Sequence, residues 1–372
     1  MRAKIVSIKD MPADLIVQWN RWAAPEGRLI SPYFRFEFAE TVSWARDDVR
    51  VAILEDGEDV VGFFPHHTPQ GGVVRPVGAP MSDYQGVISG DFSKLDPQKI
   101  VKATGASAMV YDNWYCPMGG HQSGRRSREG SVIVDLSAGS EAYFEAQKAQ
   151  FKDHFKKSDR RYRAATRDFG EVKTVLGDAS GVCFQTLSDW KQEQYRNSGK
   201  LNVFGIDWVQ EVLTNLRHRE GQEFSGLTSS LWFGDRLAAV EFGLVADDIY
   251  HSWFPAYDPE LAKYSPGTLL MHGIFEQAHT RGLRRVDIGR EDAQYKKYYA
   301  SYEVPLDQGH ILTGGLAAFG IQSWGVAETA ARIMPEKLAA LPGRVRRRWS
   351  QACAFEPRLA PRLVNLATSI SL

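Results

Sequence analysis

The run AKYSPGTLL, residues 262–270, has residue types suited to binding a phosphate group. Pro266 fits the first turn of a helix because its missing N–H would be unpaired there, and Gly267 lets a ligand come close to the backbone. The N–H groups of Gly267, Thr268 and Leu269 would then point outward at the positive end of the helix dipole, an arrangement that binds pyrophosphate. The predicted binding turn comprises Tyr264, Ser265, Pro266, Gly267, Thr268 and Leu269. A helix N-cap formed by Ser265, without any ligand, fits the same residues.

Polar and aromatic residues in three other segments suit recognition of a sugar. SDYQG and DNWYCPMGGHQSGRR are predicted to be loops between strands, on which Asp83, Tyr84 and Trp114 would hydrogen-bond to or stack on a saccharide. His251 and Tyr257, in the aromatic run IYHSWFPAYD, complete the predicted substrate site. For the aromatic loop residues and for His251, burial in a core is the alternative.

The composition is that of a globular protein without a charge preference for its partners. The chain has 372 residues, 43% of them hydrophobic, with 45 Lys+Arg against 45 Asp+Glu, so it is long enough for two domains and no DNA partner is expected. Cys116, Cys183 and Cys353 lack the spacing of a metal site, and no metal is expected. The motifs GxGxxG, GxxxxGK[ST], HExxH and GxSxG do not occur, which argues against nicotinamide, nucleotide-hydrolysing, zinc-protease and α/β-hydrolase chemistry.

The apolar segments predict a cytoplasmic protein. The N-terminus does not resemble a signal peptide, and no run reaches the roughly 18 apolar residues of a membrane span. The run ILTGGLAAFGIQSWGVA, residues 311–327, is too short and too interrupted by Gly and Gln to cross a membrane, but it could touch a membrane surface. Peripheral contact with the inner membrane therefore stays open.

Two stretches of the chain repeat one order of elements. β-rich runs flank the turn residues Asp56 and Gly57 in the first half, and similar runs flank Gly234 and Asp235 in the second. Each hairpin is followed by a further strand, a helix and a β-rich run. We therefore predict an α/β (α+β) fold with two units, each a mixed, mainly antiparallel sheet flanked by helices. The expected boundaries are 1–142 for the first unit, 143–170 for a basic linker helix, 171–312 for the second unit and 313–372 for a helical, basic C-terminal tail.

The second unit resembles a known family. The segment FPAYDPELAKYSPGTLLMHGIFEQAHTRGLRRVDIGREDAQYKKYYA is similar to the CelD-like acetyltransferases, a GNAT-fold branch associated with exopolysaccharide synthesis, including holdfast polysaccharide, and related to the Fem peptidyltransferases. Family members carry runs similar to AYDPxxxxYSPGxLL and D-x-G-x-G-D/E-x-x-Y-K. The likeness is dense over 251–300 and weaker over 1–250, where the first unit lacks the SPGT turn. Glu291 precedes Asp292 where the family often has Gly, so either carboxylate can hold the family position.

The resemblance implies tandem GNAT-like units, the second of which binds acetyl-CoA at the SPGT turn. It implies an N-acetyltransferase in which an amine of an amino sugar, in an exopolysaccharide or its lipid-linked precursor, attacks the thioester directly. Asp287, Glu291 or Asp292 would receive the amine proton. Tyr295 would supply a hydroxyl near the sulfur, and Lys296 would pair with a carboxylate or bind an acceptor phosphate. Alternatively, Asp287 caps a turn and the tyrosines, at helical spacing, belong to a core.

Two other functions fit the sequence. A Fem-like transferase that uses aminoacyl-tRNA would need a large basic face, for which the segment 143–170 is the candidate. A ligand-binding protein with inactive units fits the tail PGRVRRRWSQ, where four arginines next to Trp349 suit the phosphates and guanine edges of cyclic di-GMP. These are Arg344, Arg346, Arg347 and Arg348. A basic membrane-surface patch or a solvated tail is the alternative for this cluster.

Overall fold

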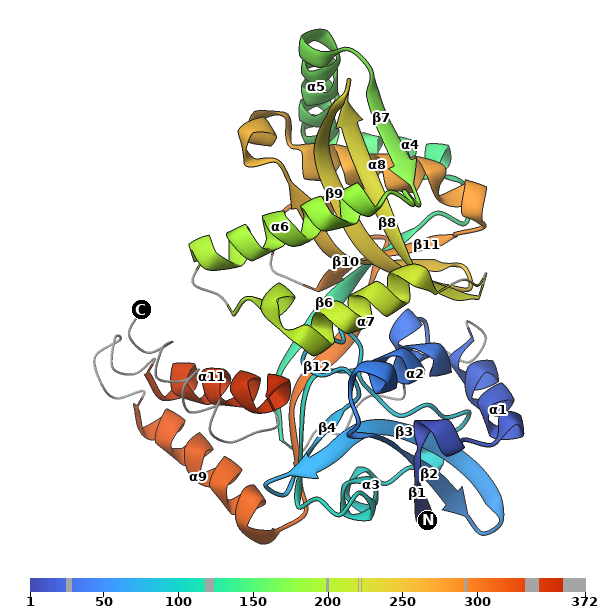
Figure 1. Ribbon diagram of the computed structural model, residues 1–372, viewed down its shortest axis with the longest axis vertical. Coiled ribbons are helices and arrows are strands. Elements are labelled where there is room, and N and C mark those ends of the chain that lie inside the picture. Colours follow the sequence, from blue (N-terminus) through green and yellow to red (C-terminus); the bar gives the residue numbers. More distant parts are fainter. Residues whose placement is uncertain are drawn as a thin grey trace. The chain divides into compact units, whose positions relative to one another are not determined.

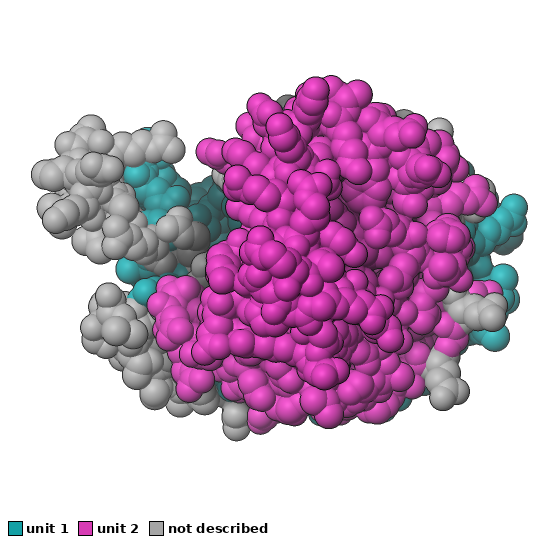
Figure 2. Space-filling model, turned by 90° about the horizontal axis from the view of Figure 1, so that it is seen from above, with its two compact units in different colours: residues 1–29, 42–128, 306–372 teal, residues 30–41, 129–305 magenta. Residues whose placement is uncertain are grey.

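The chain folds as two compact units with one order of elements. The computed structural model describes residues 1–24, 29–117, 124–198, 201–219, 221, 223–290, 293–331 and 341–356. Unit 1 consists of residues 1–29, 42–128 and 306–372, and unit 2 of residues 30–41 and 129–305 (Figure 2). The predicted mixed α/β fold with tandem units is confirmed, because the strands of the two units follow one order.

The sheet of unit 2 starts with four antiparallel strands and continues with a parallel one. Its meander is β7 (Val172–Leu176), β8 (Phe224–Phe233), β9 (Arg236–Ala246) and β10 (Ile249–Tyr257). β11 (Arg285–Arg290) then pairs parallel to β10, and β6 (Arg125–Asp135) pairs antiparallel to β11. Gly234 has a φ of 57° at the tip of the β8–β9 hairpin, a conformation that glycine adopts at little cost. The turn predicted there is confirmed.

Helices cover both faces of this sheet. Between β10 and β11 the chain forms η6 (Pro259–Tyr264), α8 (Pro266–Gln277) and η7 (Ala278–Arg281). The apolar core of the unit lies between the sheet, α8, α4 (Ser140–Gln150) and α5 (Lys152–Phe169). α6 (Gly181–Ser198) and α7 (Asp207–His218) contact the strands too, and Figure 1 shows α6 in front of them and α8 behind. The smaller elements are η3 (Pro32–Phe34), η5 (Val203–Gly205), η8 (Lys296–Tyr298) and the start of α2 (Phe36–Ala45).

Unit 1 repeats this order. β1 (Arg2–Ser7), β2 (Val49–Asp56), β3 (Asp59–Gln70) and β4 (Val73–Pro76) are antiparallel neighbours, and β5 (Ala108–Trp114) pairs parallel to β4. Between β4 and β5 lie η4 (Phe92–Lys94) and α3 (Pro97–Ala103), and β12 (Tyr302–Leu312) pairs antiparallel to β5. The remaining helices are η1 (Ile8–Asp10), α1 (Ala13–Ala23), α9 (Gly315–Ala331) and α11 (Leu341–Phe355). The hairpin predicted near Asp56 is present, with Gly57 at a φ of 68°.

The units do not follow the boundaries expected from the sequence. β6 follows β5 along the chain but pairs with β11 in unit 2, whereas β12 follows β11 but pairs with β5 in unit 1. The last strand of each repeat thus belongs to the sheet of the other repeat. The segment 143–170 is not a linker, because α4 and α5 bury Phe144, Phe155 and Ala165 in the core of unit 2. Within the described residues, no helix is both long and apolar enough to cross a membrane.

Candidate active site

Strands β10 and β11 separate in the middle of the unit 2 sheet. Their parallel pairing has three registered positions, which end at His251 opposite Asp287, although the strands continue to Tyr257 and Arg290. The pairing of β10 with β9 shifts between Ser252 and Phe254, as at a β-bulge. A bulge re-aims side chains and backbone groups and is common next to active sites. The last paired residues therefore lie where the sheet opens.

His251 and Asp287 form a buried pair at this opening. Both side chains are fully buried, and His251 Nδ1 lies 3.3 Å from Asp287 Oδ2. The other carboxylate oxygen, Oδ1, accepts hydrogen bonds from Ser131 Oγ at 2.7 Å and from the Gly289 N–H at 2.8 Å. A carboxylate held in this way orients an imidazole and stabilises its protonated form. With its Oδ2 3.3 Å from His251 Nδ1, Asp287 is placed to stabilise a protonated His251. The direct proton acceptance predicted for Asp287 stays a prediction.

The other predicted catalytic residues lie just beyond β11. Lys296 is 7% exposed, and its Nζ donates to the carbonyl oxygens of Gly289 at 3.2 Å and Arg290 at 3.1 Å. It thereby ties η8 to the end of β11, which is a structural contact that the sequence did not predict. Tyr295 is 42% exposed, with its ring 6.4 Å from that of Tyr299. Glu291 and Asp292 lie outside the described residues.

Tyr299 is the centre of a buried polar network. Its Oη lies 2.8 Å from His154 Nε2 and 2.8 Å from His272 Nε2, and its carbonyl accepts a hydrogen bond from Tyr143. A phenol has one hydrogen, so one imidazole accepts it while the other donates. Burial lowers the pKa of His272 to about 3 and raises that of Tyr299. Burial also lowers the pKa of His154, so both imidazoles are neutral near pH 7. The network fixes Tyr299, the residue that follows η8. The sequence had no signal for it, because its members are far apart in the chain.

A second buried acid, in β9, was not predicted from the sequence. Glu241 accepts a hydrogen bond from Tyr250 Oη at 2.7 Å, and burial raises the pKa of its carboxyl. A Cβ on Gly243 would lie 2.4 Å from Cζ of Tyr250, so only glycine lets the Tyr250 ring cross this strand. A glycine inside a strand is the signal that could have indicated such a close approach.

The start of α8 differs both from the predicted phosphate-binding turn and from the alternative, a helix N-cap formed by Ser265. Ser265 has left-handed dihedral angles, φ 53° and ψ 57°, and its side chain does not cap the helix. The N–H groups of Thr268 and Leu269 donate to the Ser265 carbonyl at 3.0 and 3.2 Å, instead of pointing outward. Of the three predicted donors, Gly267 alone has no partner among the described residues. The space beside Gly267 is open, since the nearest atom to a Cβ there would be Tyr257 Cδ1 at 3.8 Å.

The rest of the predicted turn faces the core. Tyr264 is 4% exposed, and its Oη donates to Asp168 Oδ2 at 2.7 Å. Pro266 and Leu269 are buried too, whereas Ser265 and Thr268 are half-buried. The surface that a ligand could reach is therefore narrower than predicted, and it centres on Gly267.

The predicted sugar-binding residues are divided between the two units. Trp114 is the last residue of β5, 7% exposed and packed on Tyr111, so its placement on a loop was wrong. Tyr84 is 2% exposed and Asp83 is half-buried. These residues belong to unit 1, whereas His251 and the half-exposed Tyr257 belong to unit 2.

Two of the four arginines predicted to bind cyclic di-GMP have described side chains. Arg346 forms an ion pair with Glu328 of α9, and Arg348 is half-buried. The side chains of Arg344 and Arg347 lie outside the described residues. Binding of cyclic di-GMP here stays a prediction.

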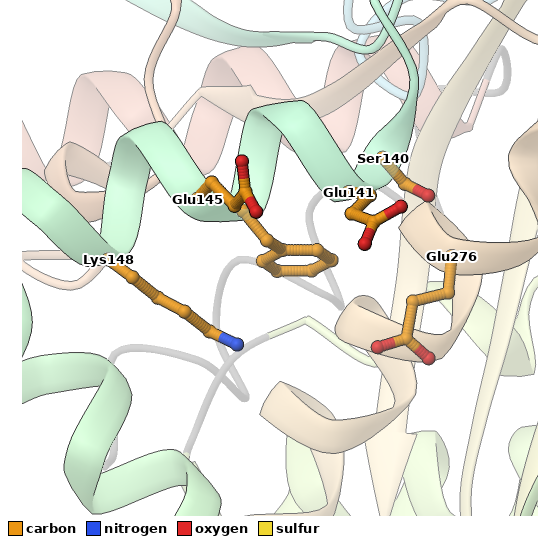
Figure 3. Close-up of a pocket in the computed structure, with 6 residues that line it drawn as sticks. Ser140, Glu141, Glu145, Lys148 and Glu276 are labelled. Atoms are coloured by element: carbon orange, nitrogen blue, oxygen red, sulfur yellow. The ribbon is translucent and has the colours of Figure 1, made fainter.

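One cavity of unit 2 lies away from the strand opening. It has a volume of about 360 Å³ and is lined by α4 and by Glu276, at the opposite end of α8 from Gly267. The Lys148 Nζ lies 5.8 Å from the centre of the Phe144 ring, and Figure 3 shows Lys148 and Glu276 among the residues that line the cavity. Among the described residues, no cluster of His, Cys, Asp or Glu has the form of a metal site.

Comparison with known proteins gives a family match for the segment in which β10 and β11 separate. Residues 153–297 match the family model "Acetyltransferase (GNAT) domain". This part of unit 2 is a GNAT-type acyltransferase domain. It contains His251, Asp287 and the start of α8, whereas Ser131 lies before it, in β6. No curated protein matches the chain.

Three solved structures resemble the chain at low identity. A conserved protein of unknown function from Bacteroides thetaiotaomicron is 10% identical, with 83% of this chain and 98% of that chain covered and a TM-score of 0.49. A tandem GNAT protein from the clavulanic acid biosynthesis pathway is 10% identical, with 85% and 100% covered and a TM-score of 0.48. FemX is 9% identical, with 79% and 98% covered and a TM-score of 0.48.

Proposed function

We propose that unit 2 transfers the acetyl group of acetyl-CoA to the amine of an amino sugar. The observation that carries this proposal is the His251–Asp287 pair, which lies where β10 and β11 separate inside the segment that matches the GNAT domain. The thioester is the activated acyl group, and the amine nitrogen attacks its carbonyl carbon as the C–S bond breaks. The protein has to bind the donor, accept the amine proton and stabilise the leaving thiolate.

The residues at the opening divide these tasks. His251 accepts the amine proton, directly or through water, and Asp287 stabilises the imidazolium that forms. Ser131 and the Gly289 N–H hold Asp287 in place from two sides. Tyr295, whose side chain is 42% exposed, is the candidate for returning a proton to the thiolate. Glu291 and Asp292 follow β11 directly in the sequence and stay candidates for the same proton transfers.

The donor site is proposed at the start of α8. The Gly267 N–H lies at the positive end of a 12-residue helix, and an open space adjoins it. A pyrophosphate at this position would gain one backbone hydrogen bond and the attraction of the helix dipole. The half-buried Ser265 and Thr268 flank this position.

The amino-sugar acceptor rests on the resemblance of residues 251–300 to the CelD-like acetyltransferases. It is proposed to belong to an exopolysaccharide of the holdfast type or to its lipid-linked precursor. The half-buried Trp253 is next to His251 in the chain, and its ring lies 5.4 Å from that of Tyr33. An indole ring at this position offers a stacking surface for a sugar.

Calorimetric titration of acetyl-CoA into the full chain tests the donor site, with Gly267→Asp and Gly267→Ala as a matched pair. Both side chains fit the open space, but the carboxylate repels a pyrophosphate. We expect Gly267→Ala to bind like the parent and Gly267→Asp to bind on the order of 100-fold more weakly. Equal affinity of the two variants would remove this turn from the site. No binding by the parent protein would overturn the acetyl-CoA proposal and favour an aminoacyl-tRNA donor.

A further inference from the structure

Helix α9 is apolar on the side that faces solvent as well as on the side that packs. Its start packs closely on unit 1, where a Cβ on Gly72 would lie 3.2 Å from that of Ala317, and Ala318 is buried. Glu328, the one charged residue among its 17, is paired with Arg346 of α11. A helix that is apolar all round is normally covered on all sides.

The exposed side carries a stripe of apolar residues, interrupted only by Ser323, which we call the outer stripe. Leu316 is 91% exposed, Phe319 68% and Val326 70%. Their spacing puts them on one helix face together with the exposed Ser323 and Ala330, because positions three, four and seven apart lie above one another. The outer stripe has no charged residue and is about 21 Å long at 1.5 Å per residue. Exposed apolar side chains gathered on one face often mark an interaction site.

The surroundings of the outer stripe are aromatic and positively charged. Trp324 of α9 is 38% exposed and Trp349 of α11 is 37% exposed, and Figure 1 shows the two helices side by side in unit 1. Arg126 and Arg346 lie close enough to act together on His310, whose pKa is lowered by burial first and then by these two charges. Glu328 balances one of them. Asp112 acts on Arg126 as well. The sequence of α11 has four arginines and no acidic residue, against the single Glu328 of α9, so the two helices together carry a net positive charge.

The size and charge of this surface select a lipid partner over a protein. The outer stripe is one side chain wide, whereas a stable protein interface covers about 800 Å² on each partner. A helix with exposed Leu, Phe and Val beside tryptophans and arginines is the combination that lies in a membrane interface, with the rings at the headgroups and the cations on anionic phosphates. We propose that α9 inserts the outer stripe into the surface of a membrane that contains anionic lipids, without crossing it.

Vesicle co-sedimentation of the full chain tests this proposal, with vesicles of phosphatidylcholine and phosphatidylglycerol and vesicles of phosphatidylcholine alone. We expect binding to the anionic vesicles, and weaker binding to the neutral ones because the arginines lose their partners. Leu316→Ser and Phe319→Ser should each weaken binding about tenfold or more, since each removes a large apolar side chain from the lipid contact. Val182→Ser changes an equally exposed valine of α6, at 69%, and should bind like the parent.

Two results would overturn the proposal. The first is absence of vesicle binding by the parent, or equal binding by the parent and both outer-stripe variants. The second is a dimer, detected by light scattering without lipid, that Phe319→Ser dissociates and Val182→Ser does not, because the outer stripe would then be a self-association surface. Circular dichroism checks that the variants are folded, which is expected because the changed side chains are exposed. The test does not depend on the acyltransferase activity.

Discussion

The two units share one order of strands and differ where the central strands separate. In unit 2 the parallel pairing of β10 and β11 ends with His251 opposite Asp287. In unit 1 the corresponding pairing starts at Val73 opposite Ala108, and the residues two positions further along the strands are Arg75 and Val110. Arg75 donates to Ser350 Oγ of α11 at 3.2 Å, so it contacts the C-terminal region. One fold therefore holds a buried His–Asp pair in one copy and a structural contact in the other.

The N-terminal end of the helix near the strand separation also differs between the two units. In unit 1, Asp96 caps α3, with its Oδ1 accepting from the N–H groups of Gln98 at 2.9 Å and Lys99 at 3.2 Å. In unit 2, Ser265 leaves the start of α8 without a side-chain cap. A carboxylate already occupies the positive helix end in unit 1, so a phosphate there would meet like charge. These two local differences support the proposal that unit 2, and not unit 1, binds the acyl donor.

Asp287→Asn has the largest expected effect, because it removes the charge that stabilises protonated His251. We expect kcat for acetyl transfer to fall by about 100-fold or more, with the affinity for acetyl-CoA nearly unchanged. Steady-state kinetics and calorimetry measure the two quantities, and thermal unfolding checks the fold. Arg75→Gln is the matched change in unit 1, and its turnover should equal that of the parent. An equal loss of turnover in both variants would break the comparison between the units.

A buried histidine in each unit should make both units less stable as the pH falls. Burial lowers the pKa of His272 in unit 2 to about 3 and that of His66 in unit 1 to about 4, from 6.5. Both folded-state values are depressed, so the unfolded chain takes up protons first, and stability present above pH 6.5 is lost as the pH falls through this window. Between pH 7 and pH 5 each histidine should cost about 2 kcal/mol of unfolding free energy.

Urea unfolding of His272→Gln and His66→Gln at both pH values measures this cost. Each variant should lose less stability than the parent when the pH falls from 7 to 5. If the parent and the variants lost the same unfolding free energy between pH 7 and pH 5, these imidazoles would not be held neutral in the fold.

Asp96→Ala has the smallest expected effect and tests the helix starts. Loss of the cap should cost about 1 kcal/mol of stability, while the affinity for acetyl-CoA and its stoichiometry of one stay unchanged. Denaturant unfolding and calorimetry measure these. A rise to two bound ligands would show that the cap alone keeps unit 1 from binding, and that the residues at its strand opening matter less than we infer.

Local patterns predicted much of the fold and part of the site. Alternating apolar residues around Gly57 and Gly234 indicated the hairpins, and Pro266 marked the first residue of α8, because turn and helix-start preferences depend on a few neighbouring residues. The left-handed conformation of Ser265 was not predicted. A non-glycine residue rarely adopts it, and here the surrounding structure imposes it.

The sequence by itself determined the repeated order of strands and helices, the start of α8 and the resemblance of its segment to an acyltransferase family. The tertiary structure alone decided which unit receives β6 and β12, that Ser131 from β6 holds Asp287, and that Tyr299 joins His154 to His272. The physical reason is the separation along the chain over which each kind of interaction acts. Hydrophobic period and turn chemistry act between neighbours in the chain, whereas strand exchange and buried hydrogen bonds can join distant residues. Ser131 and Asp287 are 156 positions apart, and His154 and Tyr299 are 145 positions apart.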